Sequence, residues 1–105
     1  MPEYNKLVRD KIPDIIAANG ETPVTRTLSD DEYEHALIEK IAEEQKELSQ
    51  ADTTEKMLQE LADLQEVVLA LARHLESVEE LEQVRVQKVA ERGGFEDRVF
   101  LERTE

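Results

Sequence analysis

The most constraining feature of the sequence is a helical segment, residues 53–75, that is apolar around well over half of its circumference. A helix that packs against one neighbour needs an apolar stripe only about 100° wide. We therefore expect this helix to be buried from two sides, within a helical bundle. Its apolar side chains are Met57, Leu58, Leu61, Leu64, Val67, Val68, Leu69, Leu71, Ala72 and Leu75.

Three helix starts are marked by a small polar residue three positions before a glutamate. This spacing is typical of a capping box, in which the two side chains bind each other's backbone N–H groups. The pattern predicts helices over residues 30–50, 53–75 and 78–92, and Gly93-Gly94 ends the last because glycine adopts the left-handed conformation without steric cost. The three starts are Ser29-Asp30-Asp31-Glu32, Asp52-Thr53-Thr54-Glu55 and Ser77-Val78-Glu79-Glu80.

A shorter helix and two strand-like segments complete the expected domain. Ile12-Pro13 places proline in a first helical turn, and Asn19-Gly20 ends that helix. Residues 22–28 and 95–101 are rich in β-branched or aromatic side chains, which predicts two short strands, the first an edge strand because of its proline. The predicted fold is therefore a mainly all-α single domain over residues 1–105, to which a short terminal β pair could be added.

The size and charge of the chain limit its classes of partner. A domain of 105 residues buries only about 60–65% of its unfolded surface, so a partner subunit would add to its stability. The net charge of −13 argues against binding a nucleic acid polymer, which needs a basic surface. A nucleotide is still compatible, because a divalent cation can screen carboxylates from phosphates. The excess of acid also has a simpler reading, which is that it keeps a helical protein in solution.

The sequence gives no sign of export or of membrane insertion. It has no cysteine, which excludes disulfides and thiolate metal sites. It also has no apolar run near the roughly 20 residues of a membrane span, and no secretory leader. We therefore expect a cytoplasmic protein that does not associate with membranes.

A carboxylate interrupts the apolar seam of the helix at residues 30–50. Leu37, Ile41 and Leu48 form this seam. At about 100° per residue, Glu44 lies about 20° outside it and therefore on the core side, while Glu47 lies on its flank. A carboxylate at this position is costly unless something compensates its charge.

The helix at residues 53–75 repeats the anomaly, with Glu60 on an apolar stripe and Asp63 one step over. Two helices thus each carry an acidic i, i+3 pair in apolar surroundings. Burial of one unpaired charge costs several kcal/mol, and four neighbouring carboxylates repel one another. Oxygen ligands at this density favour a hard divalent cation, Mg²⁺ or Mn²⁺. The alternative is that each pair lies at the solvated rim of its stripe and binds nothing.

The helix at residues 78–92 carries a basic stripe on the same face as its apolar residues. This stripe consists of Arg85, Lys88 and Arg92. If it faces the core it can hold phosphate oxygens, for which arginine is well suited. Equally, these side chains can extend to solvent and pair with the surplus glutamates.

Several of these motifs together resemble one enzyme family. Glu43-Glu44-x-x-Glu47 followed by Glu60-x-x-Asp63 resembles the EExxE...ExxD signature of the all-α nucleoside triphosphate pyrophosphohydrolases, which include MazG, dimeric dUTPases and phosphoribosyl-ATP pyrophosphohydrolase. Nearly the whole chain resembles a small, MazG-like, phosphoribosyl-ATP pyrophosphohydrolase-like branch. The terminal motifs that carry this likeness are Tyr4-Asn5-Lys6-Leu7-Val8-Arg9-Asp10-Lys11-Ile12-Pro13 and Lys88-x-x-x-Arg92-Gly93-Gly94-Phe95.

The resemblance implies a metal-dependent hydrolase that cleaves a nucleoside triphosphate, or a related nucleotide such as phosphoribosyl-ATP, between its α and β phosphates. The implied metal ligands are Glu44, Glu47, Glu60 and Asp63. Glu43 would lie behind the ligands or assist the attacking water. Candidates to stabilise the leaving pyrophosphate are Lys40, Lys88 and Arg92. The chain lacks the extra helices of dimeric dUTPases, so uracil specificity is not implied.

The resemblance also bears on the N-terminus and on assembly. Candidates to contact base, ribose or phosphate are Asn5, Arg9, Asp10 and Lys11, although Arg9 and Asp10 could equally anchor the segment by salt bridges. A homodimer at least is implied, with helices of two subunits in one four-helix bundle, in agreement with the two-sided apolar helix. Dimer and tetramer are both compatible with the sequence.

Two other classes of protein compete with this hypothesis. A helical interaction protein without catalysis would use the broad apolar face only to build an oligomer, and metal would then change neither its melting temperature nor nucleotide turnover. A carboxylate-bridged di-iron bundle needs Glu-x-x-His on two helices. Only Glu32 and His35 fit, since His74 has no glutamate three residues before it, and the di-iron class is therefore disfavoured.

Overall fold

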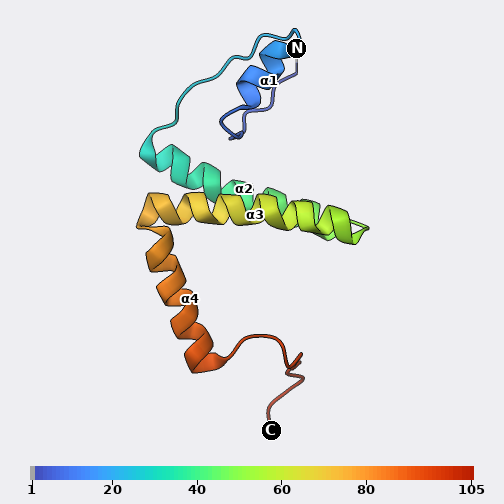
Figure 1. Ribbon diagram of the computed structural model, residues 1–105, viewed down its shortest axis with the longest axis vertical. Helices are drawn as coiled ribbons and strands as arrows, with labels where there is room; N and C mark the ends of the chain where they lie inside the picture. Colours follow the sequence, from blue (N-terminus) through green and yellow to red (C-terminus); the bar gives the residue numbers. More distant parts are fainter. Residues whose placement is uncertain (1) are drawn as a thin grey trace.

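The computed structural model describes residues 2–105, which form four helices and no strands (Figure 1). The helices are α1 (Ile12–Ala18), α2 (Asp30–Gln50), α3 (Thr54–Leu75) and α4 (Val78–Arg92). The prediction of an all-α fold is confirmed, and the predicted helix bounds agree with these to within one or two residues. Within the described part of the chain, none of the helices has the length and apolar character needed to cross a bilayer.

The helix ends show why these boundaries could be predicted. At the start of α2, Ser29 and Glu32 form the complete capping box: the Glu32 N–H donates to Ser29 Oγ (3.3 Å) and the Ser29 N–H donates to Glu32 Oε1 (3.1 Å). Thr53 and Ser77 cap α3 and α4 by accepting a backbone N–H. The cap of α3 is thus Thr53, which binds the Lys56 N–H, and not Asp52 as the predicted motif implied, so α3 begins one residue later than predicted. Gly93 follows α4 with a φ of 84°, a conformation that favours glycine.

The α2–α3 pair is the only extensive helix packing among residues 2–105. These two helices are joined by a short turn and lie side by side, while α4 leaves the end of α3 and points away from the pair (Figure 1). The interior of the pair is small, with Leu37 and Ala72 as its buried apolar residues and Glu44 buried beside them. The described chain is thus a helical hairpin with an open side.

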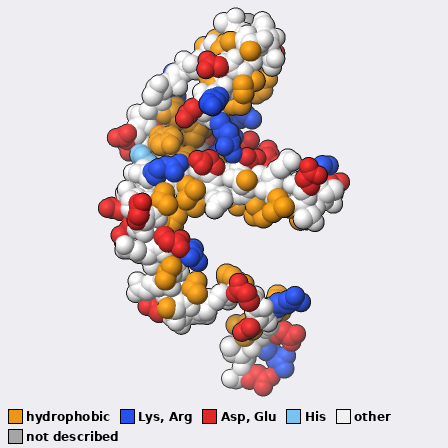
Figure 2. Space-filling view, viewed as in Figure 1, with side chains coloured by type: hydrophobic (Ala, Val, Ile, Leu, Met, Phe, Trp, Pro, Cys, Tyr) orange, Lys and Arg blue, Asp and Glu red, His pale blue; other side chains and the backbone are white. Residues whose placement is uncertain are grey.

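The exposed surface is much larger than a chain of this length normally shows. A compact domain of 105 residues has a radius of gyration of about 13 Å, whereas the value here is 17.9 Å. The accessible surface is 9560 Å², against about 6,000 Å² for a folded monomer of this size. Apolar side chains account for part of this excess, and Figure 2 shows them on the α2–α3 pair and along α4. Those exposed on α3 are Met57, Leu58, Leu61 and Leu75, and those on α4 are Leu81, Val84, Val86 and Val89. In a single chain, α3 is therefore covered on one side and largely open on the other.

The prediction of two short strands is wrong. Residues 22–28 and 95–101 have no regular structure, and Figure 1 places them in separate parts of the molecule. Side chains such as Val24 and Phe95 are almost fully exposed. β-Branched and aromatic composition measures how well a segment suits a half-buried pleated surface, and a strand needs a neighbouring strand to receive its backbone hydrogen bonds. Neither segment has one among the described residues.

Candidate metal centre

Three carboxylates from two helices converge at the α2–α3 interface. Glu44 and Glu47 lie one turn apart on α2, and Glu60 faces them from α3. One oxygen from each of the three lies within 4.8 Å of the other two. The packing of the hairpin thus brings together three of the four acids that were predicted to share a site, and Asp63 is not one of them. We call these three residues the carboxylate cluster.

The cluster contains buried oxygens that have no hydrogen-bond partner. Glu44 is only 6% exposed, and within the described residues its Oε2 accepts no hydrogen bond. Glu60 Oε2 is likewise buried and without a partner. Buried carboxylate oxygens are ordinarily paired or bound to metal, because the loss of hydration costs several kcal/mol. The unpaired oxygens and the all-oxygen donor set fit a hard divalent cation.

The burial of these carboxylates also changes their pKa values. Burial raises the pKa of Glu44 from 4.5 to about 7, with further contributions from the negative charges of Glu47 and Asp63. Burial also raises the pKa of Glu60, helped by its interaction with Glu47. Without a cation, the folded chain therefore relieves part of the repulsion by holding a proton at Glu44 up to near-neutral pH, and Glu60 binds its proton more tightly than a free glutamate does.

Two lysines lie at one edge of the cluster and are centred on Glu43 rather than on the buried oxygens. Lys40 Nζ lies 3.5 Å from Glu43 Oε2 and 3.9 Å from Glu44 Oε1. Lys6 Nζ lies 3.7 Å from Glu43 Oε1. The Glu43 carboxylate is therefore held between two ammonium groups, while the compensation of Glu44 is incomplete. Lys6 belongs to the N-terminal motif but was not among the predicted site residues, since nothing in its spacing pointed to α2.

Asp63 is paired outside the cluster. Its Oδ1 accepts a hydrogen bond from Arg9 Nη2 at 2.6 Å, across 54 positions of sequence. Both side chains are partly exposed, Arg9 at 58% and Asp63 at 40%. The structure thus places Arg9 near the carboxylate cluster. The same ion pair anchors the N-terminal segment to α3. Figure 2 shows Lys and Arg side chains gathered where this segment meets the α2–α3 pair.

Among the described residues, no hydrogen bond or ion pair joins the other predicted site residues to the cluster. Asn5 is exposed with a φ of 45°, and Lys11 is exposed at the start of α1. Lys88 and Arg92 are exposed on α4, which points away from the pair that carries the cluster (Figure 1). Their neighbour Arg85 forms an ion pair with Glu82 on the same helix.

A shallow depression adjoins the cluster. It has a volume of about 250 Å³ and is lined by Glu47, Gln50, Ala51, Lys56 and Glu60. Lys56 was not predicted as a site residue, and its ammonium is paired with Asp52 Oδ1 at 3.1 Å. A ligand bound to Glu47 and Glu60 in this depression would therefore also lie near Lys56.

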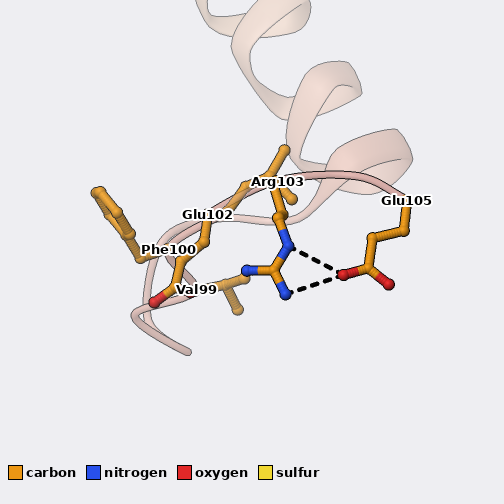
Figure 3. A pocket seen from close by; sticks show the side chains of 6 residues that line it. Val99, Phe100, Glu102, Arg103 and Glu105 are labelled. Carbon is orange, nitrogen blue, oxygen red and sulfur yellow. Dashed lines mark hydrogen bonds and ion pairs between the residues drawn. The ribbon is translucent and has the colours of Figure 1, made fainter.

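A second hollow, of about 400 Å³, lies in the C-terminal segment and has no link to the carboxylates (Figure 3). Its charged groups are largely satisfied among themselves, because both Nε and Nη2 of Arg103 contact Glu105 Oε1, at 3.0 and 2.9 Å. The candidate functional site is consequently the carboxylate cluster.

Comparisons with known proteins are sparse. A relative from Mycolicibacterium smegmatis, described as an uncharacterized protein, is 57% identical over 54 residues. The match covers 51% of this chain and 55% of that protein, so the chain spans about half the length of the relative it matches. No protein-family model and no solved structure matches the chain.

Proposed function

We propose that the protein is a metal-dependent nucleotide pyrophosphohydrolase of the MazG-like, all-α class. It would convert a nucleoside triphosphate or a related nucleotide, such as phosphoribosyl-ATP, and water into a nucleoside monophosphate and pyrophosphate. The observation that carries this proposal is the convergence of Glu44, Glu47 and Glu60 from two helices, with buried oxygens that lack partners. The resemblance of the sequence to the EExxE...ExxD signature supports the same conclusion.

The carboxylate cluster would hold Mg²⁺ or Mn²⁺. When bound, such a cation neutralises phosphate charge and lowers the pKa of a bound water. Two of the three ligands come from α2 and one from α3, so the site exists only when the hairpin is packed. Asp63, which the resemblance implies as a fourth ligand, stays a prediction.

Glu43 and Lys40 would act next to the ligands. Glu43 lies between Lys40 and Lys6, and the two ion pairs fix the direction of its carboxylate. A carboxylate oriented in this way can accept a proton from a water that attacks the α phosphorus. The bond between that phosphorus and the oxygen bridging to the β phosphate breaks, and the pyrophosphate carries the bridging oxygen away. Lys40, at 17% exposure, can donate hydrogen bonds to a phosphate oxygen when it moves away from Glu43.

A second copy of this chain would cover the open face of α3. The accessible surface exceeds that of a compact monomer by about 3,500 Å². A standard interface buries about 800 Å² on each partner, so this excess is large enough for one. Apolar residues exposed on α3 and α4 form the core of this surface. A homodimer in which the two α2–α3 pairs form a four-helix bundle would bury them. It would also give Lys88 and Arg92 a route to the partner's cluster, which they lack within one chain.

The decisive test is pyrophosphate release from a panel of nucleoside triphosphates and phosphoribosyl-ATP with Mg²⁺ or Mn²⁺. We expect metal-dependent turnover that falls by at least about 100-fold in Glu60→Gln, because one ligand of the site is lost. Glu39→Gln is the matched control, since Glu39 is an exposed glutamate of α2 and should turn over like the wild type. Turnover that persists in Glu60→Gln would exclude the proposed site.

The second candidate function is a non-catalytic helical interaction protein. The exposed apolar face of α3 favours this reading as much as it favours an oligomeric enzyme. The two differ in the response to metal: a pure interaction protein would bind neither Mn²⁺ nor nucleotide and would keep its melting temperature when metal is added.

A further inference from the structure

Residues 95–101, after α4, carry an apolar surface that no described residue covers. Phe95, Val99, Phe100 and Leu101 are between 76% and 95% exposed, and both phenylalanines of the sequence lie in this segment. Figure 3 shows the ring of Phe100 pointing away from the Arg103–Glu105 pair, so the end of the chain does not cover it. Large apolar side chains exposed side by side mark a contact with another molecule. We call residues 95–101 the C-terminal arm.

The backbone of the C-terminal arm has a defined conformation. The Arg98 N–H donates to the Phe95 carbonyl at 3.1 Å and closes a turn. The Phe95 N–H donates to Glu96 Oε2 at 3.0 Å. Arg98 has a φ of 59°, in the left-handed region that is unfavourable for a residue with a side chain. Such a conformation persists where surrounding contacts hold it. Since the side chains of the arm are exposed in a single chain, we expect a second molecule to supply these contacts.

The arm begins far from the apolar surface of its own hairpin. It follows α4 after Gly93-Gly94, and α4 points away from the α2–α3 pair (Figure 1). A helix of 15 residues is about 22 Å long, which separates the start of the arm from the end of α3. Residues 95–101 span at most about 25 Å when fully extended. Only the tip of the arm could therefore reach back to its own α3.

A second copy of this chain offers a surface for the arm. The accessible surface exceeds that of a compact monomer by about 3,500 Å², and a standard interface removes only about 800 Å² of this from each copy. Packing of the two hairpins alone thus leaves most of the excess uncovered. The arm also continues from α4, whose exposed Leu81 and Val89 belong to the same proposed interface. A copy that covers α4 is therefore the nearest partner for the arm.

We propose that the C-terminal arm is exchanged between two copies of this chain and packs its apolar side chains against the α2–α3 pair of the other copy. This inference rests on the homodimer of the proposed function and not on its chemistry. Phe95 lies three positions after Arg92, so an arm anchored at Phe95 holds Arg92 within about 10 Å of the same surface. The arm thereby limits where α4 and its cations lie on the other copy.

The first measurement follows the burial of the arm as the protein assembles. The sequence has no tryptophan, so Phe100→Trp places a single fluorescent reporter in the arm of the full chain. The emission maximum and quenching by acrylamide are recorded over a dilution series, and light scattering gives the mass at each concentration. Val24→Trp is the matched control, because Val24 is 96% exposed in the segment between α1 and α2.

We expect the emission of Phe100→Trp to lie at shorter wavelength, and its quenching to be weaker, in the dimer than in the monomer. Both changes should be lost on dilution with the same midpoint as dissociation of the dimer, because burial of the reporter depends on the second copy. Val24→Trp should emit as an exposed indole at every concentration.

The second measurement tests whether the arm contributes to self-association. The double variant Phe95→Ser/Phe100→Ser removes two large apolar side chains from the proposed contact and should weaken dimerisation by at least about 100-fold. Its helix content, measured by circular dichroism, should equal that of the wild type, since both residues are exposed in a single chain. Val24→Ser is the control and should dissociate like the wild type.

The third measurement identifies what the arm contacts. With p-benzoylphenylalanine in place of Phe100, irradiation of the purified dimer should give a covalent dimer on a denaturing gel. Mass spectrometry should place the crosslink on α2 or α3 of the other chain. The same photoreactive residue in place of Val24 should give no covalent dimer.

The inference is overturned if the Phe100→Trp reporter is exposed in the dimer or buried in the monomer, since the arm would then be free or folded on its own chain. It is also overturned if the double variant dissociates like the wild type, or if the crosslinks stay within one chain. A dimer whose arm is exposed contradicts the arm exchange alone and leaves the proposed function standing. A wild type that is monomeric at every concentration contradicts the proposed homodimer as well, which separates the two failures.

Discussion

Lys40 Nζ lies 3.9 Å from Glu44 Oε1, one helical turn away on α2, yet this lysine does not compensate the buried carboxyl. Burial and the neighbouring carboxylates outweigh its attraction, so the pKa of Glu44 rises to about 7. Lys40 is shared with Glu43, at 3.5 Å, and this shorter contact takes up part of its charge. The balance of charge at the site is therefore left to a further cation or to protons.

The first prediction concerns the pH dependence of stability in the absence of metal. The pKa of Glu44 is about 7 in the folded chain, against 4.5 for the unfolded one. The folded state thus holds a proton that the unfolded state releases between these pH values, and the free energy of unfolding should fall as pH rises from about 4.5 to 7. The full shift corresponds to about 3 kcal/mol, which solvent screening reduces to about 1–2 kcal/mol. Urea denaturation in EDTA at a series of pH values measures this slope.

Glu44→Gln tests whether the slope comes from this residue. A glutamine cannot ionise, so the variant should be more stable than the wild type at pH 7.5 and should show a shallower slope. The raised pKa of Glu60 has the same sign and leaves part of the slope in place. Glu39→Gln should keep the wild-type slope, and a flat wild-type profile between pH 5 and 7.5 would contradict the burial of Glu44.

The second prediction concerns stabilisation by metal. Mg²⁺ or Mn²⁺ at about 100 times its dissociation constant should stabilise the folded state by about 2.7 kcal/mol, which raises the melting temperature by roughly 10 °C for a domain of this size. Glu44→Gln and Glu60→Gln should abolish this rise, because each removes an oxygen ligand of the cluster. Thermal denaturation followed by circular dichroism, with and without metal, checks this. Equal rises in Glu60→Gln and in the Glu39→Gln control would mean that the metal binds elsewhere.

The helices could be predicted from the sequence because their signals are local. Ser29 and Glu32 are three positions apart, and the apolar period of α2 and α3 shows directly which side faces the interior. The same period placed Glu44 and Glu60 on facing sides, so the acidic part of the site could be predicted. Local patterns do not contain the pairing of Arg9 with Asp63, which joins residues 54 positions apart.

The errors and omissions have the same cause. Residues 22–28 and 95–101 have strand-like composition, but a strand depends on a neighbour that composition cannot reveal. The face of α4 that carries Lys88 and Arg92 was identified from its period, yet the direction in which α4 leaves α3 is set by the turn at Glu76–Ser77. Contacts with another chain lie outside what a helical period can encode.

The third prediction concerns the cap that fixes the start of α2. Ser29→Ala removes the acceptor of the Glu32 N–H and should lower the free energy of unfolding by about 1 kcal/mol. For a domain of this size the melting temperature should fall by about 4–8 °C. Ser49→Ala is the matched control, because the Ser49 hydroxyl donates to the Lys46 carbonyl near the end of the same helix and caps no N–H group. If the two alanine variants melt at the same temperature, the capping box does not stabilise α2.

The last prediction concerns the open face of α3. Leu58 is 61% exposed in a single chain, and we expect a second copy to bury it. Leu58→Lys would then place an ammonium in an apolar interface, which costs several kcal/mol and should weaken self-association by at least about 100-fold. Size-exclusion chromatography with light scattering should show a dimer or larger assembly for the wild type and a shift to monomer for the variant.

Val24→Lys is the control for this experiment, because Val24 is 96% exposed in the segment between α1 and α2. The substitution adds the same charge as Leu58→Lys, but outside the helices. It should assemble like the wild type. If self-association through α3 also completes the proposed nucleotide site, Leu58→Lys should lower nucleotide turnover at low protein concentration, and raising the concentration should restore it in proportion to the fraction of dimer. A monomeric wild type at micromolar concentration would show that a second copy does not cover this face.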